Sequence, residues 1–192
     1  MPREFNYDIM PEIKTRWSPR AFSGEKLSVE ELMPLFEAAR WAPSCFNEQP
    51  WRFVLATNED ELAQMRELLT ADNRLWADKA PALALVLAHN RFAYNDKENY
   101  WHMFDAGTAW GFLSLEAERR GLITHAMGGF SRKRAQESFN IPEQYTIICV
   151  VAIGRMGEKA DLHEKFIDRE QPGARESLED IFVKFDRHRE RT

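Results

Sequence analysis

Apolar residues recur every three or four positions in several stretches of the chain, a spacing that predicts amphipathic helices. One stretch follows Ser28, whose spacing to Glu31 has the form of a capping box, and we expect Pro43 to end this helix. Two further helices are expected to begin at Asn58 and at Ser177. The three apolar faces consist of Leu32, Leu35, Phe36 and Ala39, of Leu62, Met65, Leu68 and Leu69, and of Leu178, Ile181, Phe182 and Phe185.

The longest helical pattern runs from about Asn99 to Arg120, with Gly121 as the expected C-cap. Its middle part, Met103–Leu115, is apolar around nearly the whole circumference, and its polar exceptions are Asp105, Thr108 and Ser114. A helix with this pattern is typically buried on almost every side. We therefore expect this helix to be buried on nearly every side.

Four stretches have the patterns of strands. Trp51–Ala56 alternates, whereas Ala82–Ala88 and Thr146–Ile153 are continuous apolar runs, typical of strands buried on both faces. Leu122–Met127 is expected as a short strand, followed by a turn and a polar helix from Ser131. Helices thus alternate with buried strands, which predicts an α/β or α+β fold with a layer of sheet.

Composition narrows the class of protein. A chain of 192 residues with 44% hydrophobic and 30% charged residues predicts one folded domain, residues 1–192. A net charge of −5 argues against a nucleic-acid-binding protein. The apolar runs are far shorter than the roughly 20 residues of a membrane span. Two cysteines, Cys45 and Cys149, make no disulfide framework or thiolate metal site, so we expect free thiols and a cytoplasmic location.

Common catalytic motifs are missing from the sequence. It contains no Gly-x-Gly-x-x-Gly, no Walker loop, no Gly-x-Ser-x-Gly and no His-Glu-x-x-His, and its five histidines lack the spacing of metal ligands. These absences argue against a zinc hydrolase or a serine hydrolase.

Two clusters near the N-terminus could bind a ligand. Arg16, Ser18 and Arg20 could surround a phosphate, because arginine matches phosphate oxygens in a bidentate way; a solvated N-terminal segment is the alternative. Asn47 and Gln49 lie in a loop between two prolines and could direct their amides at a ligand. A turn capped by these amides explains them equally well.

Two further clusters lie in the second half of the chain. Gly128 and Gly129 could bring the backbone and its N–H groups close to a planar ligand, or could form a plain tight turn. Arg175 could supply another cation, although a single arginine is more often a surface residue. From about Arg155 the chain becomes mostly polar, and we expect residues 155–192 to form an arm that wraps another subunit.

Taken together and in this order, the clusters resemble the flavin-dependent nitroreductase family. The resemblance covers most of the chain and is most specific over Trp41–Phe53. It rests on Arg16-x-Ser18-x-Arg20, Glu37-Ala-Ala-Arg-Trp-Ala-Pro-Ser44, Asn47-x-Gln-Pro-Trp-Arg-Phe53, Asp105-Ala-Gly107, Gly128-Gly-Phe130, Ile141-Pro-Glu143 and Ala152-Ile-Gly154.

The resemblance implies an α+β fold, a three-layer α/β/α sandwich around a mostly antiparallel sheet, in an intertwined homodimer with FMN at its interface. It implies electron transfer from NADH or NADPH to nitroaromatics, quinones or similar small acceptors in two half-reactions. A flavin-binding storage or sensor protein, or a relative specialised for one metabolite, are the alternatives. The sequence selects neither the acceptor nor the nicotinamide.

The resemblance also implies cofactor-binding residues, and no catalytic side chain, because the flavin itself carries the redox chemistry. Those expected at the phosphate and the pyrimidine edge are Arg16, Trp17, Ser18, Arg20 and Arg175. Those expected at the ring, partly from the partner subunit, are Pro43, Ser44, Cys45, Asn47, Asn73, Gly128 and Gly129.

Overall fold

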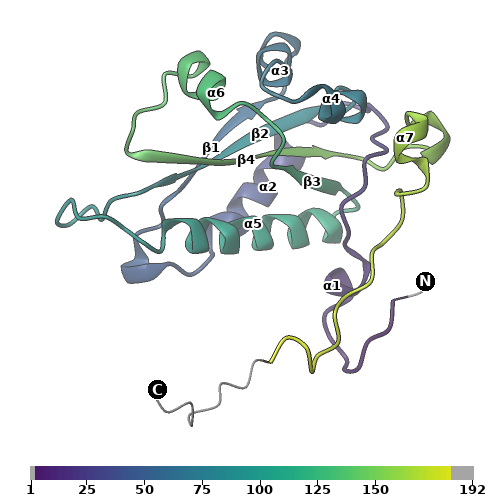
Figure 1. Ribbon diagram of the computed structural model, residues 1–192, viewed down its shortest axis with the longest axis horizontal. Helices are drawn as coiled ribbons and strands as arrows, with labels where there is room; N and C mark the ends of the chain where they lie inside the picture. The colour runs from purple at the N-terminus through teal and green to yellow at the C-terminus, as the bar shows by residue number, and fades with distance from the viewer. Residues whose placement is uncertain (1–2, 183–192) are drawn as a thin grey trace, which may run out of the picture.

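A four-stranded antiparallel sheet forms the middle layer of the molecule (Figure 1). The structure is a computed structural model and describes residues 3–182. The strands are β1 (Trp51–Ala56), β2 (Ala82–His89), β3 (Ile123–Met127) and β4 (Tyr145–Gly154), in the order β1-β2-β4-β3. All four predicted strands are therefore confirmed, with bounds that differ by one residue at most.

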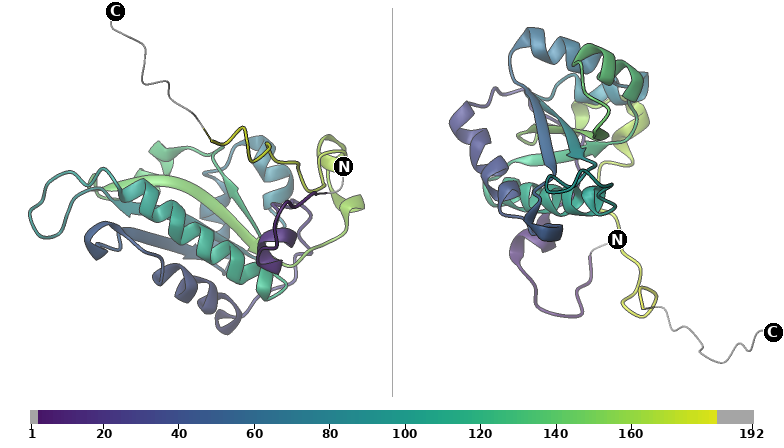
Figure 2. Two further views of the ribbon diagram at one scale, coloured as in Figure 1. Left: turned by 90° about the horizontal axis from the view of Figure 1, so that it is seen from below. Right: turned by 90° about the vertical axis from the view of Figure 1, so that its left-hand side faces the viewer.

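Helices cover both faces of the sheet. α2 (Val29–Arg40) and α5 (His102–Arg119) lie side by side on one face (Figure 2). α3 (Glu59–Arg66), α4 (Ala71–Ala77) and α6 (Arg132–Ser138) lie on the other face (Figure 1). This arrangement confirms the α+β class and the three-layer sandwich.

The alternating side chains of β2 divide the core into two halves, because neighbouring side chains of a strand point to opposite faces. Leu83, Leu85 and Leu87 join the cluster under α3, α4 and α6. On the other face β2 contributes mainly alanine to the cluster under α2 and α5, which lets these helices approach the sheet closely.

Local sequence rules explain where several helices begin and end. Ser28 accepts a hydrogen bond from the Glu31 N–H, and the Glu31 carboxylate accepts one from the Ser28 N–H, so the predicted capping box is present. Gly121 follows α5 with a φ of +70°, as expected of a C-cap. The helix expected from Asn58 is shorter than predicted, since α3 ends at Arg66 and a separate helix, α4, follows.

The prediction that α5 is buried on nearly every side is wrong for the single chain. Ala106, Ala109 and Leu113 are buried against the sheet and α2. The opposite side of the helix is open, and Met103 and Phe104 are 52% and 72% exposed. None of the helices in residues 3–182 is long and apolar enough to cross a membrane.

The polar segment after β4 differs in part from the predicted arm around another subunit, because its first part packs against its own chain. It contains the 3-10 turn η2 (Lys159–Asp161) and α7 (Glu164–Ile167), and Leu162 and Phe166 are buried in the chain's own core. Only the part beyond Gln171 leaves the body, beside the N-terminal segment that carries α1 (Pro11–Thr15) (Figure 1). The helix predicted from Ser177 is not formed up to residue 182, where the chain makes a turn; Phe185 lies outside the described residues.

Candidate functional site

Five arginines from the two ends of the chain surround a cavity of about 200 Å³. We call it the arginine cavity, and its arginines are Arg3, Arg16, Arg20, Arg169 and Arg175. Its remaining lining residues within the described chain are Trp17, Ser18, Gln171 and Gly173, so no carboxylate lines it. The structure thus brings together five sequence-predicted site residues: Arg16, Trp17, Ser18, Arg20 and Arg175.

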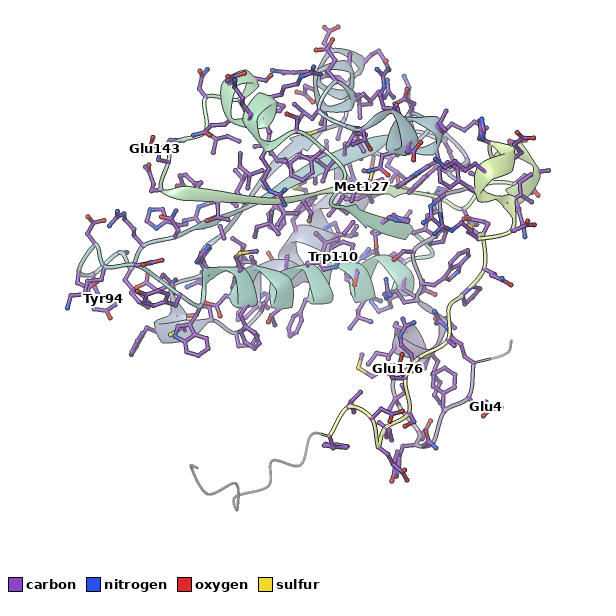
Figure 3. The ribbon with its side chains drawn as sticks, in the orientation of Figure 1. Glu4, Tyr94, Trp110, Met127, Glu143 and Glu176 are labelled. Atoms are coloured by element: carbon purple, nitrogen blue, oxygen red, sulfur yellow. The ribbon has the colours of Figure 1, made fainter. Side chains whose placement is uncertain are left out.

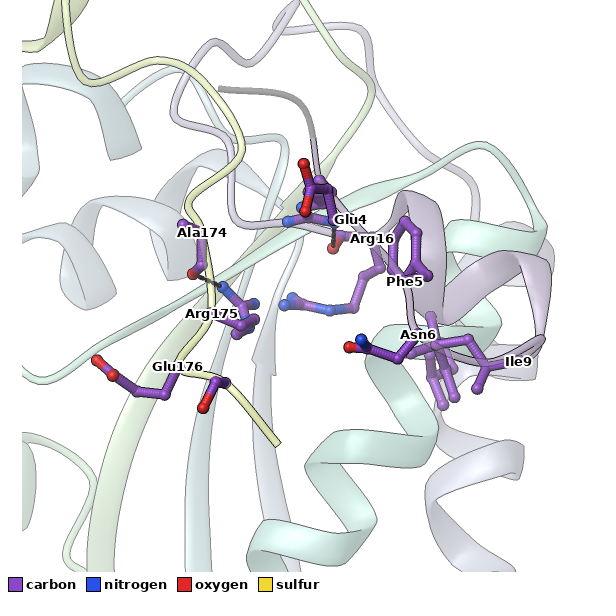
Figure 4. Close-up of a pocket in the computed structure, with 12 residues that line it drawn as sticks. Glu4, Phe5, Asn6, Ile9, Arg16, Ala174, Arg175 and Glu176 are labelled. Carbon is purple, nitrogen blue, oxygen red and sulfur yellow. Dashed lines mark hydrogen bonds between the residues drawn. The ribbon is translucent and has the colours of Figure 1, made fainter. Parts of the chain in front are cut away.

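The arginines of this cavity repel one another. The guanidinium groups of Arg16 and Arg175 point toward each other in Figure 4, and Arg175 donates a hydrogen bond of 2.9 Å to the Ala174 carbonyl. Burial lowers the pKa of Arg16, and the charges of Arg175 and Arg3 lower it further. Arginine nevertheless stays protonated in proteins, so the cavity holds concentrated positive charge and favours an anion.

A larger cavity of about 760 Å³ adjoins the first and shares Arg3, Arg16 and Arg175 with it. It lies between the N-terminal segment and the segment after Gly173 (Figure 4). Apolar side chains, including Phe5 and Leu115, form part of its wall. The combined space has a cationic end and a partly apolar end.

Arg20 is held by aromatic rings of two helices. Its guanidinium carbon lies 5.9 Å from the ring centroid of Trp76 on α4 and 5.5 Å from that of Phe166 on α7. The His125 ring lies 4.5 Å from the Trp76 ring, and its Nδ1 donates a 2.9 Å hydrogen bond to the Pro19 carbonyl. Burial lowers the pKa of His125. The segment that carries Arg16 and Arg20 is thereby attached to α4, β3 and α7.

The Gly128-Gly129 turn is fixed by the same helix α4. The Gly129 carbonyl accepts hydrogen bonds from Asn73 Nδ2 at 2.9 Å and from the Thr70 N–H at 3.0 Å. A Cβ on Gly129 would lie 2.8 Å from Asn73 Nδ2, whereas a Cβ on Gly128 would meet nothing within 4 Å. Neither glycine has a positive φ, so this turn does not use a left-handed backbone conformation.

Asn73 and Trp76 are one helical turn apart on α4 and therefore lie on the same side of this helix. Asn73 contacts the glycine turn, and Trp76 contacts Arg20. The helix α4 consequently connects the glycine turn to the arginine cavity. In the described chain, Asn73 acts by holding this turn.

The loop between α2 and β1 is built around unusual backbone conformations. It contains the 3-10 turn η1 (Cys45–Asn47), in which Phe46 and Asn47 have φ values of 51° and 57°. The Ser44 hydroxyl accepts a hydrogen bond from the Gln49 N–H at 2.9 Å. The Cys45 N–H donates to Asp105 Oδ2 at 3.1 Å, which ties the loop to the first turn of α5.

One chain does not bring this loop and the arginine cavity together. The loop touches α5 at Asp105, whereas the larger cavity, which adjoins the arginine cavity, borders α5 at Leu115, ten residues further along. At 1.5 Å per residue these positions are about 15 Å apart along the helix axis. Figure 3 shows the same separation, because Tyr94, whose ring lies 6.0 Å from that of Phe46, is at the opposite end from Glu176.

The fold and these clusters agree with comparisons to known proteins. The Nitroreductase family model matches residues 13–75 and 70–155. The chain therefore belongs to the nitroreductase family, and the resemblance seen in the sequence is confirmed.

Individual relatives agree with the family. A solved structure of an oxidoreductase containing FMN has a TM-score of 0.90 and 36% identity, with 95% of this chain and 94% of that chain covered. An Archaeoglobus fulgidus protein, provisionally named NADH dehydrogenase/NAD(P)H nitroreductase, is 29% identical over 161 residues, 82% of this chain and 90% of its own. The iodotyrosine deiodinase of Thermotoga neapolitana is 25% identical over 171 residues, 77% of this chain and 87% of its own.

Sequence reasoning missed Arg3 and Arg169, which line the arginine cavity, and Glu170, which lies between two lining residues of the chain. Arg3 precedes α1, and its Nη1 donates to the carbonyls of Lys14 and Arg16, both at 2.9 Å. Arg169 and Glu170 follow α7, within the polar segment that we expected to leave the body. No local pattern marks them, because their importance arises from contacts between distant parts of the chain.

Proposed function

We propose that this chain is an FMN-dependent oxidoreductase that passes electrons from NADH or NADPH to nitroaromatics, quinones or similar organic acceptors. The arginine cavity is the observation that carries the proposal. It gathers five cations and no lining carboxylate within residues 3–182 of a chain whose net charge is −5. A phosphate monoester carries about two negative charges at pH 7 and suits such a cavity.

The residues of the cavity fit the phosphate of FMN. Arg16, Arg20 and Arg175 can donate charge-assisted hydrogen bonds, and the Ser18 hydroxyl adds a further donor. Gly128 leaves open space where a side chain would stand, which suits a flat ring near the glycine turn. Bound flavin would supply two-electron redox chemistry, while the protein supplies orientation and hydrogen-bond donors.

The arrangement supports a homodimeric site. Because the loop around Cys45 and the arginine cavity are separated along α5, we infer that the loop beside a flavin held at the cavity comes from a second copy of the chain. The exposed side of α5 carries Phe104 and Met103, and large apolar surfaces of this kind commonly mark subunit interfaces. We therefore place Pro43, Ser44, Cys45 and Asn47 of one copy against the flavin held by the other.

We place the protein in the cytoplasm. Cys45 and Cys149 are both free thiols, which fits a reducing compartment. Burial raises the pKa of Cys149 to about 11, so this thiol stays protonated and unreactive.

Reductive dehalogenation is a second candidate activity. It is favoured by the similarity to the Thermotoga neapolitana protein named iodotyrosine deiodinase. An iodinated phenol would then replace the nitroaromatic as the electron acceptor.

Anaerobic mixing of the flavin-loaded protein with NADH or NADPH tests the proposal. We expect the visible absorbance of the oxidised flavin to bleach faster than that of free FMN, and to return when a nitroaromatic, a quinone or an iodophenol is added. Free FMN at the same concentration is the control. A loaded protein that bleaches no faster than free FMN would point to storage or sensing and refute the oxidoreductase.

A further inference from the structure

Glu170 is a buried carboxylate that the proposed function leaves without a role. Its side chain is only 1% exposed. Its Oε1 accepts two backbone hydrogen bonds, from the Arg20 N–H at 2.7 Å and from the Ala21 N–H at 2.9 Å. It thereby joins the segment after α7 to a segment 150 residues earlier in the chain.

The second oxygen of Glu170 faces the side chain of the same arginine. Oε2 lies 4.0 Å from Arg20 Nη1 and has no hydrogen-bond partner among the described residues. Phe166, four residues before Glu170, packs against the Arg20 guanidinium. Glu170 and Phe166 thus restrain both the backbone and the side chain of Arg20.

The neighbours of Glu170 on either side line the arginine cavity. Arg169 and Gln171 belong to one wall, and Arg16 and Arg20 belong to the other. A carboxylate at this place is costly, because it is buried and would repel a bound phosphate. Its hydrogen bonds to the Arg20 and Ala21 N–H groups hold the segment after α7 against the N-terminal segment, and this stabilising contact offsets the cost of the buried carboxylate.

We infer that Glu170 is a positioning residue for phosphate binding: it joins the two walls of the arginine cavity and sets Arg20 toward the phosphate without touching it. This inference rests on the proposed function, in which the cavity holds the FMN phosphate. It predicts that loss of the carboxyl group affects recognition of the phosphate and spares recognition of the flavin ring.

The test compares the affinities of the apo protein for FMN and for riboflavin, which lacks the phosphate. Flavin fluorescence titration gives both dissociation constants. We expect Glu170→Ala to weaken FMN binding about tenfold or more, the scale of a lost charged hydrogen bond, with riboflavin binding changed less than about twofold. Glu170→Gln keeps an oxygen that can accept both N–H groups and should stay within about threefold of wild type for FMN.

A matched control lies in the same segment of the chain. Asp161 pairs with Lys79 at 3.4 Å and also attaches this segment to the body, but it forms no hydrogen bond or ion pair with residues 16–21 of the described chain. Asp161→Ala should leave the ratio of the FMN and riboflavin affinities unchanged. If Glu170→Ala fails to fold, Glu170→Asp replaces it, since the shorter side chain cannot reach both N–H groups in the same way, and we expect a loss of about threefold or more.

Amide hydrogen exchange of the apo protein separates this inference from the proposed function. Glu170→Ala, or Glu170→Asp in its place, should speed exchange at Arg20 and Ala21 whatever the cavity binds. A wild-type protein that binds FMN no better than riboflavin would overturn the phosphate site itself. Two results in the variant would overturn the role of Glu170. One is an unchanged exchange rate at Arg20 and Ala21, and the other is an unchanged ratio of the FMN and riboflavin affinities, including an equal loss for both ligands.

Discussion

Gly128 and Gly129 are adjacent in the turn after β3, but a side chain would be crowded at Gly129 and free of contacts at Gly128. The same substitution should therefore destabilise the protein at Gly129 and not at Gly128. A Cβ at Gly129 would lie 2.8 Å from Asn73 Nδ2 and 3.0 Å from Thr70 Oγ1, so Asn73 must move. That movement breaks its 2.9 Å hydrogen bond to the Gly129 carbonyl. A Cβ at Gly128 would meet no atom within 4 Å.

We estimate the cost from these contacts. A lost hydrogen bond costs roughly 0.5–1.5 kcal/mol. The crowding adds roughly 1 kcal/mol, the low end for an overpacked site, because both clashing atoms are ends of side chains that can shift. Gly129→Ala should therefore lower the free energy of unfolding of the apo protein by roughly 1.5–2.5 kcal/mol, which for a chain of this length corresponds to a Tm lower by roughly 3–10 °C. Gly128→Ala should change the free energy of unfolding by roughly 0.5 kcal/mol or less.

Urea unfolding of both apo variants, followed by circular dichroism, measures these differences. Asn73→Ala provides the internal control, because Gly129→Ala should cost less when the clashing amide is already absent. Equal destabilisation by Gly128→Ala and Gly129→Ala would refute the geometry of the turn. Gly128→Ala should leave the stability of the apo protein unchanged. If a flavin binds near this turn, this variant should weaken flavin binding, and that effect would report the flavin contact alone.

Three further predictions concern the phosphate, the assembly and pH. Arg20→Ala should weaken FMN binding by roughly 1.5–3 kcal/mol in equilibrium dialysis, whereas Lys133→Ala should not; retained affinity would remove Arg20 from the site. Phe104→Glu should convert a dimer to monomers in sedimentation and weaken FMN binding, and an unchanged dimer would show that the exposed side of α5 is no interface. Burial lowers the pKa of His125, so the unfolded chain binds more protons than the folded chain, and the free energy of unfolding should fall as pH decreases through about 6.5. In urea unfolding at pH 7, 6 and 5, His125→Gln should reduce this pH dependence. The same pH dependence in the variant as in the wild type would contradict the prediction.

Local chemistry explains which elements the sequence could predict. The capping box of Ser28 and Glu31 and the alternating or continuous apolar runs of the strands are readable without tertiary information. The helix α4 was missed because it has only seven residues and depends on burial of Trp76 against Phe22, whose rings stack at 6.1 Å. A contact of that kind joins segments more than fifty residues apart and leaves no periodic pattern.

Some residues of the site could be predicted from a local motif, whereas others join it only through tertiary contacts. Arg16, Ser18 and Arg20 occur in one short motif, so the sequence could group them. Glu170 and Arg169 enter the site only because α7 folds back onto the chain's own core through Phe166. The uniform apolarity of α5 could not show which side meets the sheet and which side is left open, since both sides carry similar residues.

The helix α5 gives a physical reason to link assembly with cofactor binding in the proposed homodimer. At its start, Asp105 accepts a hydrogen bond from Cys45 and so holds the loop that would cover a partner's flavin. Near its end, Leu115 borders the cavity next to the arginines of its own chain. In a two-fold dimer each α5 therefore connects half of one site to half of the other. Since a ligand that binds across an interface stabilises the assembled state, flavin should tighten the dimer, and dilution to monomers should release flavin by the same coupling free energy.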